Sequence, residues 1–260
     1  MTQSEPPFNP LDLAGRHYLV TGASSGVGRS TAILLHRLGA RLALVDRDEP
    51  GLGELATALG EAESIRTYGA DLTDTAAISE LVERSVTEGG RLHGVIHCAG
   101  IQSIAPVRSL QIEVWRRIFA VNTEAALALG KAMASRKIYA GDHGSLVFIS
   151  SVMASVGSAG AIPYSMSKAA LEGMARSLAL ELAGRRIRVN CIAPGFVRTP
   201  LFERTEQMWD ADQRQTVERQ HPLGFGQPED VANAVAFLLA DTGRWITGSV
   251  MVVDGGYLAR

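Results

Sequence analysis

Short runs of apolar, often β-branched residues alternate along the chain with longer segments that carry helical apolar periodicity. Apolar runs of this kind are typical of parallel strands buried on both faces, and the longer segments are typical of the helices that cover them. The predicted strands are His17–Thr21, Arg41–Asp46, Ser64–Ala70, Gly94–Cys98, Ser145–Ser150, Ile187–Ile192 and Ser249–Val253. Seven strands joined by helical crossovers predict an α/β fold with a doubly wound parallel sheet and helices on both faces.

Three predicted helices bear on the later argument. The first follows the first strand and runs to about Leu38, and two long ones cover Gln111–Ile138 and Tyr164–Leu182. The two long helices carry more apolar surface than one face of a sheet needs. The charged stretch Arg198–Gln220 predicts either a solvated helical pair or a mobile lid over a substrate. Its position after the sixth strand, at the carboxyl edge of the sheet, favours a lid over about residues 198–224.

Composition adds limits to this picture. The chain has 260 residues, of which 46% are hydrophobic, and these values suit a soluble globular protein. The segment before the first strand is rich in proline, lacks the pattern of a signal peptide, and predicts a flexible leader over residues 1–14. No repeat or linker divides the rest, so residues 15–260 are predicted to form a single domain.

Charge and cysteine usage exclude several classes of protein. A net charge of −2 and a pI near 6.3 argue against a nucleic-acid partner. No uncharged apolar run is long enough to span a membrane, so no membrane partner is expected. Cys98 and Cys191 have neither metal-ligand spacing nor the pattern of a disulfide framework. We therefore predict a cytoplasmic protein without a metal site.

The sequence TGASSGVG connects the first predicted strand directly to the first predicted helix. Glycines at such a turn let the backbone approach a pyrophosphate, and the amino end of the helix offers unpaired N–H groups and a partial positive charge. The placement between strand and helix makes the motif specific for a dinucleotide. The expected contacts are Gly22, Ser24, Ser25, Gly26, Val27 and Gly28.

Asp46 ends the second predicted strand, where a carboxylate can accept hydrogen bonds from both hydroxyls of the adenosine ribose. The same charge would repel the 2′-phosphate of NADP, so the predicted cofactor is NAD. Arg47 keeps NADP possible because a guanidinium can pair with that phosphate, although Ser25 offers no second basic group. For Asp71 two interpretations stay open, a contact with adenine and a helix cap.

Together these motifs resemble the short-chain dehydrogenase/reductase family. The resemblance rests on TGASSGVG, the CAG of Cys98–Gly100, Asn122 in FAVNT, Ser151 in ISS, Tyr164 and Lys168 in YSMSK, and PGFVRT at Pro194–Thr199. It runs from about Gly15 to Tyr257 with every motif in family order. It implies a Rossmann-type catalytic domain, a nicotinamide cofactor, a small carbonyl or alcohol substrate and, as partner, a second copy of the chain in a homotetramer or homodimer.

The resemblance also implies roles for four residues. Tyr164 is the general acid/base, Lys168 tunes it and holds the nicotinamide ribose, Ser151 orients the substrate oxygen, and Asn122 positions a water linking Lys168 to solvent. Residues four apart share one helix face, so Lys168 and an oxidised nicotinamide ring are expected to lower the pKa of the Tyr164 phenol. The remaining predicted cofactor contacts are Leu72, Cys98, Ala99, Gly100, Pro194, Gly195, Val197 and Thr199.

One departure stands out, because His97 and Cys98 occupy positions where the family commonly has two asparagines. For His97, packing against the neighbouring strand is favoured over a role as an acid/base on the substrate side. The predicted substrate contacts are Ser151, Met153, Tyr164, Phe196 and Phe202, with Ser155, Met208 and Trp209 as further candidates. Arg198 and Arg204 could either hold a carboxylate from the lid or be solvated.

The sequence thus predicts an NAD(H)-dependent oxidoreductase that transfers hydride between nicotinamide and a secondary alcohol or ketone. A 3-oxoacyl-thioester (acyl carrier protein) reductase using NADPH is the alternative. A non-catalytic dinucleotide-binding sensor is disfavoured, because Asn122, Ser151, Tyr164 and Lys168 are all present. A metal-dependent hydrolase is excluded because no His, Asp or Glu cluster has ligand spacing.

Overall fold

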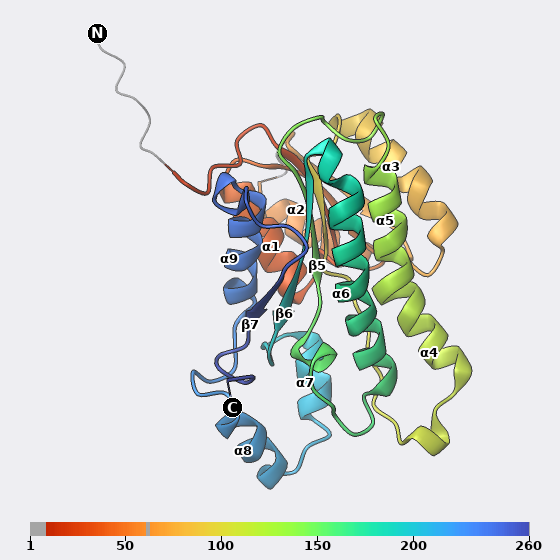
Figure 1. The fold of residues 1–260 in the computed structure, drawn as a ribbon, viewed down its shortest axis with the longest axis vertical. Helices are drawn as coiled ribbons and strands as arrows, with labels where there is room; N and C mark the ends of the chain where they lie inside the picture. The colour runs from red at the N-terminus through yellow and green to blue at the C-terminus, as the bar shows by residue number, and fades with distance from the viewer. Residues whose placement is uncertain (1–8, 61–62, 260) are drawn as a thin grey trace.

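A computed structural model describes residues 9–60 and 63–259. Its centre is a seven-stranded parallel sheet (Figure 1), as the apolar runs predict. The strands are β1 (His17–Thr21), β2 (Arg41–Asp46), β3 (Ile65–Gly69), β4 (Gly94–His97), β5 (Gly144–Ile149), β6 (Ile187–Pro194) and β7 (Val250–Val253). Every predicted strand is present, with ends that differ by at most two residues.

The strand order is β3-β2-β1-β4-β5-β6-β7. The chain therefore winds from β1 to one edge of the sheet, returns to the middle, and then winds to the other edge through β4. The direction in which the chain winds reverses between β1 and β4. These two strands pair in parallel, with Thr21 opposite His97. In open parallel sheets, ligands bind in the crevice at the carboxyl ends of the strands beside such a reversal.

Helices cover both faces of the sheet (Figure 1). On one face, α1 (Gly26–Arg37), α2 (Glu49–Ala58) and α9 (Pro228–Leu239) pack over a core that includes Leu35, Leu55 and Val235. On the other face, α3 (Thr75–Gly89), α5 (Ala125–Met133) and α6 (Ile162–Leu182) pack over Val82, Leu129 and Leu171. The sheet is thus buried on both sides, which explains its continuous apolar strands.

The predicted helix Gln111–Ile138 is present as one helical segment, but it is shorter than predicted and is not α-helical throughout. The segment forms α4 (Ile112–Phe119), a π-helical turn (Ala120–Glu124) and α5, which ends at Met133. In the π-helical turn the Ala125 N–H bonds the Ala120 carbonyl five residues earlier. Such wide turns inside helices often occur at functional sites. This one carries Asn122.

The charged stretch after β6 forms the predicted pair of helices, α7 (Pro200–Glu206) and α8 (Ala211–Arg219). Each begins with a side-chain cap. The Thr199 hydroxyl accepts from the Phe202 N–H, and Asp210 and Gln213 form a reciprocal capping box. Both helices lie beyond the carboxyl ends of the strands (Figure 1), below the sheet in that view.

The predicted leader, residues 1–14, lies partly outside the described residues. In the described part of this segment, Leu13 is fully buried and its N–H donates to the Leu38 carbonyl. The folded part therefore begins before residue 15, because the apolar Leu13 side chain completes the core beside α1 and α9.

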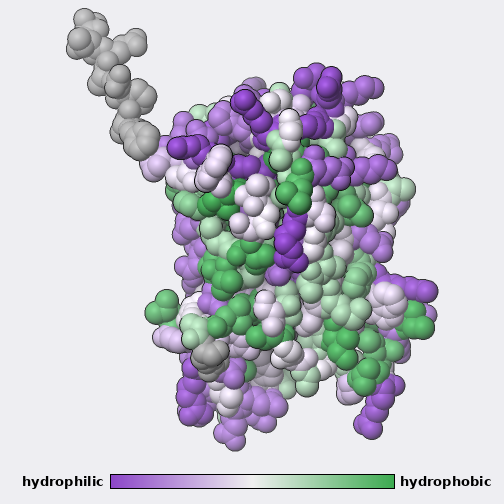
Figure 2. All heavy atoms as spheres, in the orientation of Figure 1, coloured by the Kyte–Doolittle hydropathy of each residue, from purple (hydrophilic) through white to green (hydrophobic). Residues whose placement is uncertain are grey.

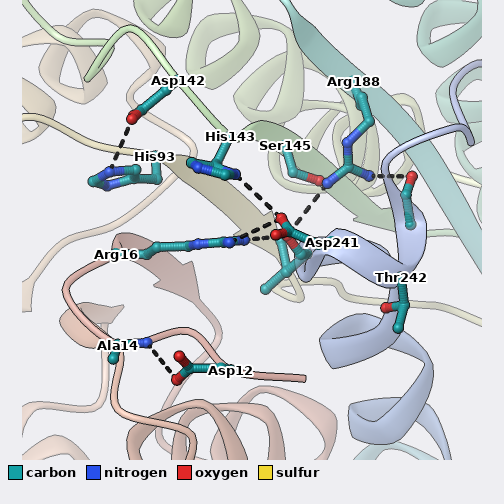
Figure 3. A network of polar contacts seen from close by, with 12 residues as sticks. Asp12, Ala14, Arg16, His93, Asp142, His143, Ser145, Arg188, Asp241 and Thr242 are labelled. Atoms are coloured by element: carbon teal, nitrogen blue, oxygen red, sulfur yellow. Dashed lines mark hydrogen bonds and ion pairs between the residues drawn. The ribbon is translucent and has the colours of Figure 1, made fainter. Parts of the chain in front are cut away.

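Charged side chains tie the elements together at the amino edge of the sheet (Figure 3). Arg16 and His143 both bond Asp241, at 2.9 and 3.2 Å, and His93 lies 3.5 Å from Asp142. The Arg188 guanidinium donates to the Gly243 carbonyl just beyond α9. These groups are at the end of the sheet opposite the crevice, so their role is structural.

Candidate active site

A cavity of about 710 Å³ opens at the carboxyl ends of the strands, beside the reversal between β1 and β4. All the predicted cofactor contacts line it: Gly22, Ser24, Ser25, Gly26, Val27, Gly28, Asp46, Arg47, Asp71, Leu72, Cys98, Ala99, Gly100, Tyr164, Lys168, Pro194, Gly195, Val197 and Thr199. Ser151, Met153, Phe196 and Phe202 line it too. Segments from seven parts of the chain therefore meet in one cavity.

The glycine turn has the geometry of an anion-binding loop. Gly22 has a φ of +69°, and a Cβ there would lie 2.7 Å from the Ala99 nitrogen. A Cβ on Gly28 would lie 2.0 Å from the Gly22 carbonyl oxygen. No side chain caps the amino end of α1, and its first turn holds no acidic residue. Its backbone N–H groups are thus available to a phosphate, and the residues present fit a dinucleotide.

Asp46 lines the cavity at the end of β2 and is held by its neighbours. Its Oδ2 accepts from the Ser24 backbone N–H at 3.1 Å and from the Ser24 hydroxyl at 2.8 Å. Its Oδ1 accepts from the Asp48 N–H at 3.1 Å. The Oδ2 atom already accepts two hydrogen bonds, whereas Oδ1 accepts one, so Asp46 is oriented and its Oδ1 can still accept from a ribose hydroxyl.

Asp71 does not cap a helix, so that interpretation is wrong. Asp74 is the cap of α3 and accepts from the Ala76 and Ala77 N–H groups. The Asp71 side chain accepts from the Thr73 N–H, and this bond lowers the pKa of its carboxyl. Asp71 lines the cavity, so the contact with adenine stays a prediction.

Ser151, Tyr164 and Lys168 converge from two elements. Ser151 follows the end of β5, and its hydroxyl accepts from the Met153 N–H at 3.1 Å. Tyr164 and Lys168 lie one turn apart on α6, and the Lys168 Nζ is 5.6 Å from the centre of the Tyr164 ring. The ammonium donates to the Ile149 carbonyl at 2.7 Å, which fixes it between β5 and α6.

The electrostatics of this trio differ from expectation. Burial raises the pKa of the Tyr164 phenol, and the Ser151 hydroxyl offsets this only in part. No lowering by Lys168 accompanies this in the protein by itself, so the lowered pKa predicted for the state with an oxidised nicotinamide ring bound stays a prediction. Burial also lowers the pKa of Lys168 to about 8. An oxidised nicotinamide ring brings a positive charge when bound, and such a charge favours the phenolate.

Asn122 does not line the cavity, although the residues around it do. Its Oδ1 accepts from the Ile101 N–H at 2.9 Å, and its Nδ2 donates to the Ile101 carbonyl and to the Ser167 hydroxyl. The Ser167 hydroxyl donates in turn to the Tyr164 carbonyl at 2.8 Å. Asn122 thus links the loop after β4 to the turn of α6 that carries Tyr164.

His97 is fully buried at the end of β4 and bonds across to β1, so the packing interpretation agrees with the structure. Its Nδ1 lies 2.9 Å from the Thr21 hydroxyl and its Nε2 lies 3.1 Å from the Val121 carbonyl. Burial, with the nearby Lys168 ammonium, lowers the pKa of His97 to about 3. The ring is therefore neutral at physiological pH and does not act as an acid/base.

This lowered pKa predicts a loss of stability in acid. The unfolded chain binds a proton at His97 below pH 6.5, whereas the folded chain does so only near pH 3. The free energy of unfolding should therefore fall from pH 6.5 toward pH 3, by about 2 kcal/mol at pH 5. Urea unfolding of the protein and of His97→Asn at pH 7 and pH 5 measures this. Equal losses in both proteins would contradict the assignment to His97.

The lid side of the cavity is mainly apolar. Met153, Phe196 and Phe202 line it, but Ser155, Met208 and Trp209 do not. The Trp209 ring packs instead against Phe196 and Phe202, with centroids 5.7 and 5.8 Å apart. Trp209 of the lid therefore supports two residues of the cavity wall and does not line the cavity itself.

Two arginines of the lid region have different positions. Arg204 lines the cavity and is exposed, and its Nε donates to the Pro200 carbonyl at 3.0 Å. Arg198 does not line the cavity, and its guanidinium lies 5.4 Å from the centre of the Phe225 ring.

Sequence reasoning missed a contact between the lid and the loop after β4. The Gln102 side-chain amide donates to the Thr205 hydroxyl and to the Leu201 carbonyl of α7, and both Gln102 and Thr205 line the cavity. The only sequence signal was their position just after two predicted contact motifs.

Among the described residues, no group of His, Cys, Asp and Glu could hold a metal ion, and no helix is long and apolar enough to cross a membrane.

A doubly wound sheet with an uncapped glycine turn at its reversal, and with serine, tyrosine and lysine on the facing wall, is the architecture of a nicotinamide-dependent dehydrogenase. A family model described as enoyl-(acyl carrier protein) reductase matches residues 22–258. The chain belongs to the short-chain dehydrogenase/reductase family, and it is an NAD(P)-dependent oxidoreductase that acts on CH–OH groups.

Individual relatives cover nearly the whole chain. Cis-4-hydroxycyclohexanecarboxylate dehydrogenase of Sinomonas cyclohexanicum is 37% identical over 95% of this chain and 98% of its own. The 3-oxoacyl-(acyl-carrier-protein) reductase of Thermotoga maritima is 36% identical over 95% and 99%. A solved structure from Beutenbergia cavernae, assigned to an NAD(P)-dependent gluconate 5-dehydrogenase with NADP at low occupancy, has a TM-score of 0.88 and 32% identity over 97% and 100%.

Proposed function

We propose that this enzyme uses NAD(H) to interconvert an alicyclic secondary alcohol and its ketone. The observation that carries the proposal is the single cavity, which joins the glycine turn and Asp46 at one end to Ser151, Tyr164 and the apolar lid wall at the other. When bound, the dinucleotide supplies or accepts the hydride. The residues of the chain supply orientation and the proton.

Each residue of the trio has one task in this proposal. Tyr164 donates its phenolic proton to the carbonyl oxygen in reduction and accepts it from the alcohol in oxidation. The Ser151 hydroxyl donates a hydrogen bond to the same oxygen and aims it at the phenol. The Lys168 ammonium, anchored on the Ile149 carbonyl, holds the ribose hydroxyls and favours the phenolate by its charge. The helical pair of residues 198–224 acts as the lid, which excludes water from the reacting atoms.

The substrate class follows from the wall chemistry and from one relative. Met153, Phe196 and Phe202 form an apolar surface that suits a hydrocarbon ring, and Arg204 is the one ionisable group that the described lid residues contribute to the wall. The Sinomonas relative acts on a cyclohexane ring that bears a hydroxyl and a carboxylate. A ring with a carboxylate opposite its hydroxyl would place the acid toward Arg204.

Initial rates test this function. The enzyme is given NADH or NADPH with four ketones: 4-oxocyclohexanecarboxylate, its methyl ester, a keto sugar and a 3-oxoacyl thioester. We expect the highest kcat/KM with NADH and a cyclic ketone, and a preference for the free acid over the ester. The Thermotoga relative supports the alternative of a thioester reductase, and preference for NADPH with the thioester would establish that alternative.

The preference for NAD is tested at Asp46. Replacing Asp46 by Asn removes the charge that repels a 2′-phosphate, so the ratio of kcat/KM for NADH to that for NADPH should fall about tenfold or more. Asp48→Asn is the matched control, because it removes an equal charge two residues away on the same cavity wall. An equal fall in both variants would show a general field effect and would contradict a specific contact at Asp46.

Self-association into a homotetramer or homodimer is part of the proposal. Apolar side chains gather on the surface beside α6 and β7 and at the lower end of α4 (Figure 2). Leu180 on α6 is 83% exposed and Trp245, which precedes β7, is 96% exposed. Burial of such residues against a second copy would be favourable. Sedimentation at micromolar concentration should show a particle larger than the 27.7 kDa chain.

The two free thiols support a cytoplasmic location, which stays a prediction.

A further inference from the structure

His97 joins two segments that border the cavity from different sides. On its Nδ1 side, at 2.9 Å, lies the hydroxyl of Thr21, the residue that leads into the glycine turn. On its Nε2 side, at 3.1 Å, lies the carbonyl of Val121, which precedes Asn122 in the π-helical turn. Both Thr21 and His97 are fully buried, so water does not compete for these bonds.

The partners determine where the protons lie. A carbonyl can only accept, so the His97 Nε2 carries the hydrogen, and in the neutral ring Nδ1 is then an acceptor. The Thr21 hydroxyl donates to Nδ1, while its oxygen accepts from the Ala99 N–H at 3.2 Å. The bonds therefore run in one direction, from the Ala99 N–H through Thr21 and His97 to the Val121 carbonyl. Each group in this chain has a partner only while the ring stays neutral.

We propose that His97 is a positioning residue that holds the dinucleotide turn and the Asn122 turn in register with each other. Its Nδ1 side fixes Thr21 and Ala99, and through them Gly22, where the proposed function places the cofactor. Its Nε2 side fixes Val121, and through it Asn122, Ser167 and the Tyr164 backbone. The proposal rests on the proposed function, since it assigns Tyr164 and the glycine turn their roles there.

The two sides can be separated by substitution. In His97→Asn the side-chain amide occupies the place of Nδ1, so its oxygen can accept from Thr21, but nothing reaches the Val121 carbonyl. In His97→Gln the longer amide occupies the place of Nε2, so it can donate to Val121, but nothing accepts from Thr21. Each variant thus removes one half of the bridge and keeps the other.

Steady-state kinetics with varied NADH and varied ketone measure what the loss of each His97 hydrogen bond does to the enzyme. We expect His97→Asn to lower kcat by about tenfold, to shift the pH profile of kcat, and to leave the KM for NADH within threefold. We expect His97→Gln to raise the KM for NADH by about tenfold and to leave kcat within threefold. Thr21→Val, which removes the hydroxyl at nearly constant volume, should reproduce the His97→Gln result and serves if His97→Gln does not fold.

Two control variants distinguish failure of the positioning role from failure of the proposed function. His17 is equally buried on β1, but at the opposite edge of the sheet, where its Nδ1 bonds the Gly90 carbonyl at 2.8 Å. His17→Asn should lower the melting temperature and leave kcat, KM and the pH profile unchanged. If both His97 variants change only the melting temperature, or change kcat and KM alike, the positioning role is overturned. If Tyr164→Phe keeps full turnover, the proposed function itself fails, whatever the His97 variants do.

Discussion

Replacing Tyr164 by Phe should lower turnover by about 10²–10⁴-fold, because it removes the proton donor and acceptor while keeping the ring. Burial raises the pKa of this phenol in the protein itself, so the group is protonated at neutral pH and ready to donate to a carbonyl. The glycine turn and Asp46 are untouched by the change, so NADH should bind nearly as before. Initial rates and NADH fluorescence titration measure the two effects.

The matched control is Tyr68→Phe. Tyr68 is a buried tyrosine of β3 whose hydroxyl donates to Glu88 at 2.9 Å, and it does not line the cavity. Its replacement likewise removes the hydroxyl of a buried tyrosine and should leave kcat within about twofold. A Tyr164→Phe enzyme that keeps more than a tenth of the rate would exclude Tyr164 as the general acid/base and would favour another proton donor.

Replacing Gly28 by Ala should weaken NADH binding by about 10²-fold, because small misplacements of binding groups have effects of this size. The new Cβ would lie 2.0 Å from the Gly22 carbonyl oxygen, a separation at which the backbone has to move. The displaced atoms belong to the turn that we propose as the pyrophosphate site. Overpacking should also lower the free energy of unfolding by about 1–3 kcal/mol. Fluorescence titration with NADH and urea unfolding measure both quantities.

Gly53→Ala is the control for this substitution. Gly53 lies in α2, and a Cβ there meets nothing within 4 Å. Alanine is the better helix former, so this variant should be more stable by up to about 1 kcal/mol and should bind NADH normally. If Gly28→Ala bound NADH as tightly as the unchanged protein, the turn would not be the pyrophosphate site.

Much of the fold follows from local patterns. The seven strands were predictable because a strand buried on both faces must be apolar throughout, and such runs are visible without any knowledge of contacts. The glycine turn was predictable because Gly22 and Gly28 leave no room for a side chain, a constraint that only glycine meets. The pairing of Tyr164 and Lys168 follows from helical periodicity alone.

Where prediction failed, distant contacts decide the structure. The segment Gln111–Ile138 has the composition of one helix, and nothing local marks a π-helical turn at Asn122. This turn is accompanied by bonds from His97 to Val121 and from Asn122 to Ile101, which reach across more than twenty residues. Likewise, the cap interpretation of Asp71 failed because α3 begins only at Thr75, where Asp74 is the adjacent carboxylate.

The sequence by itself determined the order of elements, the doubly wound sheet, and the candidates for the cofactor turn and the reactive trio, because these depend on periodicity and on residue types at short spacing. Only the tertiary structure decided the pKa values of residues in and around the site and the contacts that hold them in place. The raised pKa of Tyr164, the neutral ring of His97 and the contact of Gln102 with Thr205 arise from burial and from contacts between separate segments. Desolvation depends on every neighbour in space, and no local pattern in the sequence specifies those neighbours.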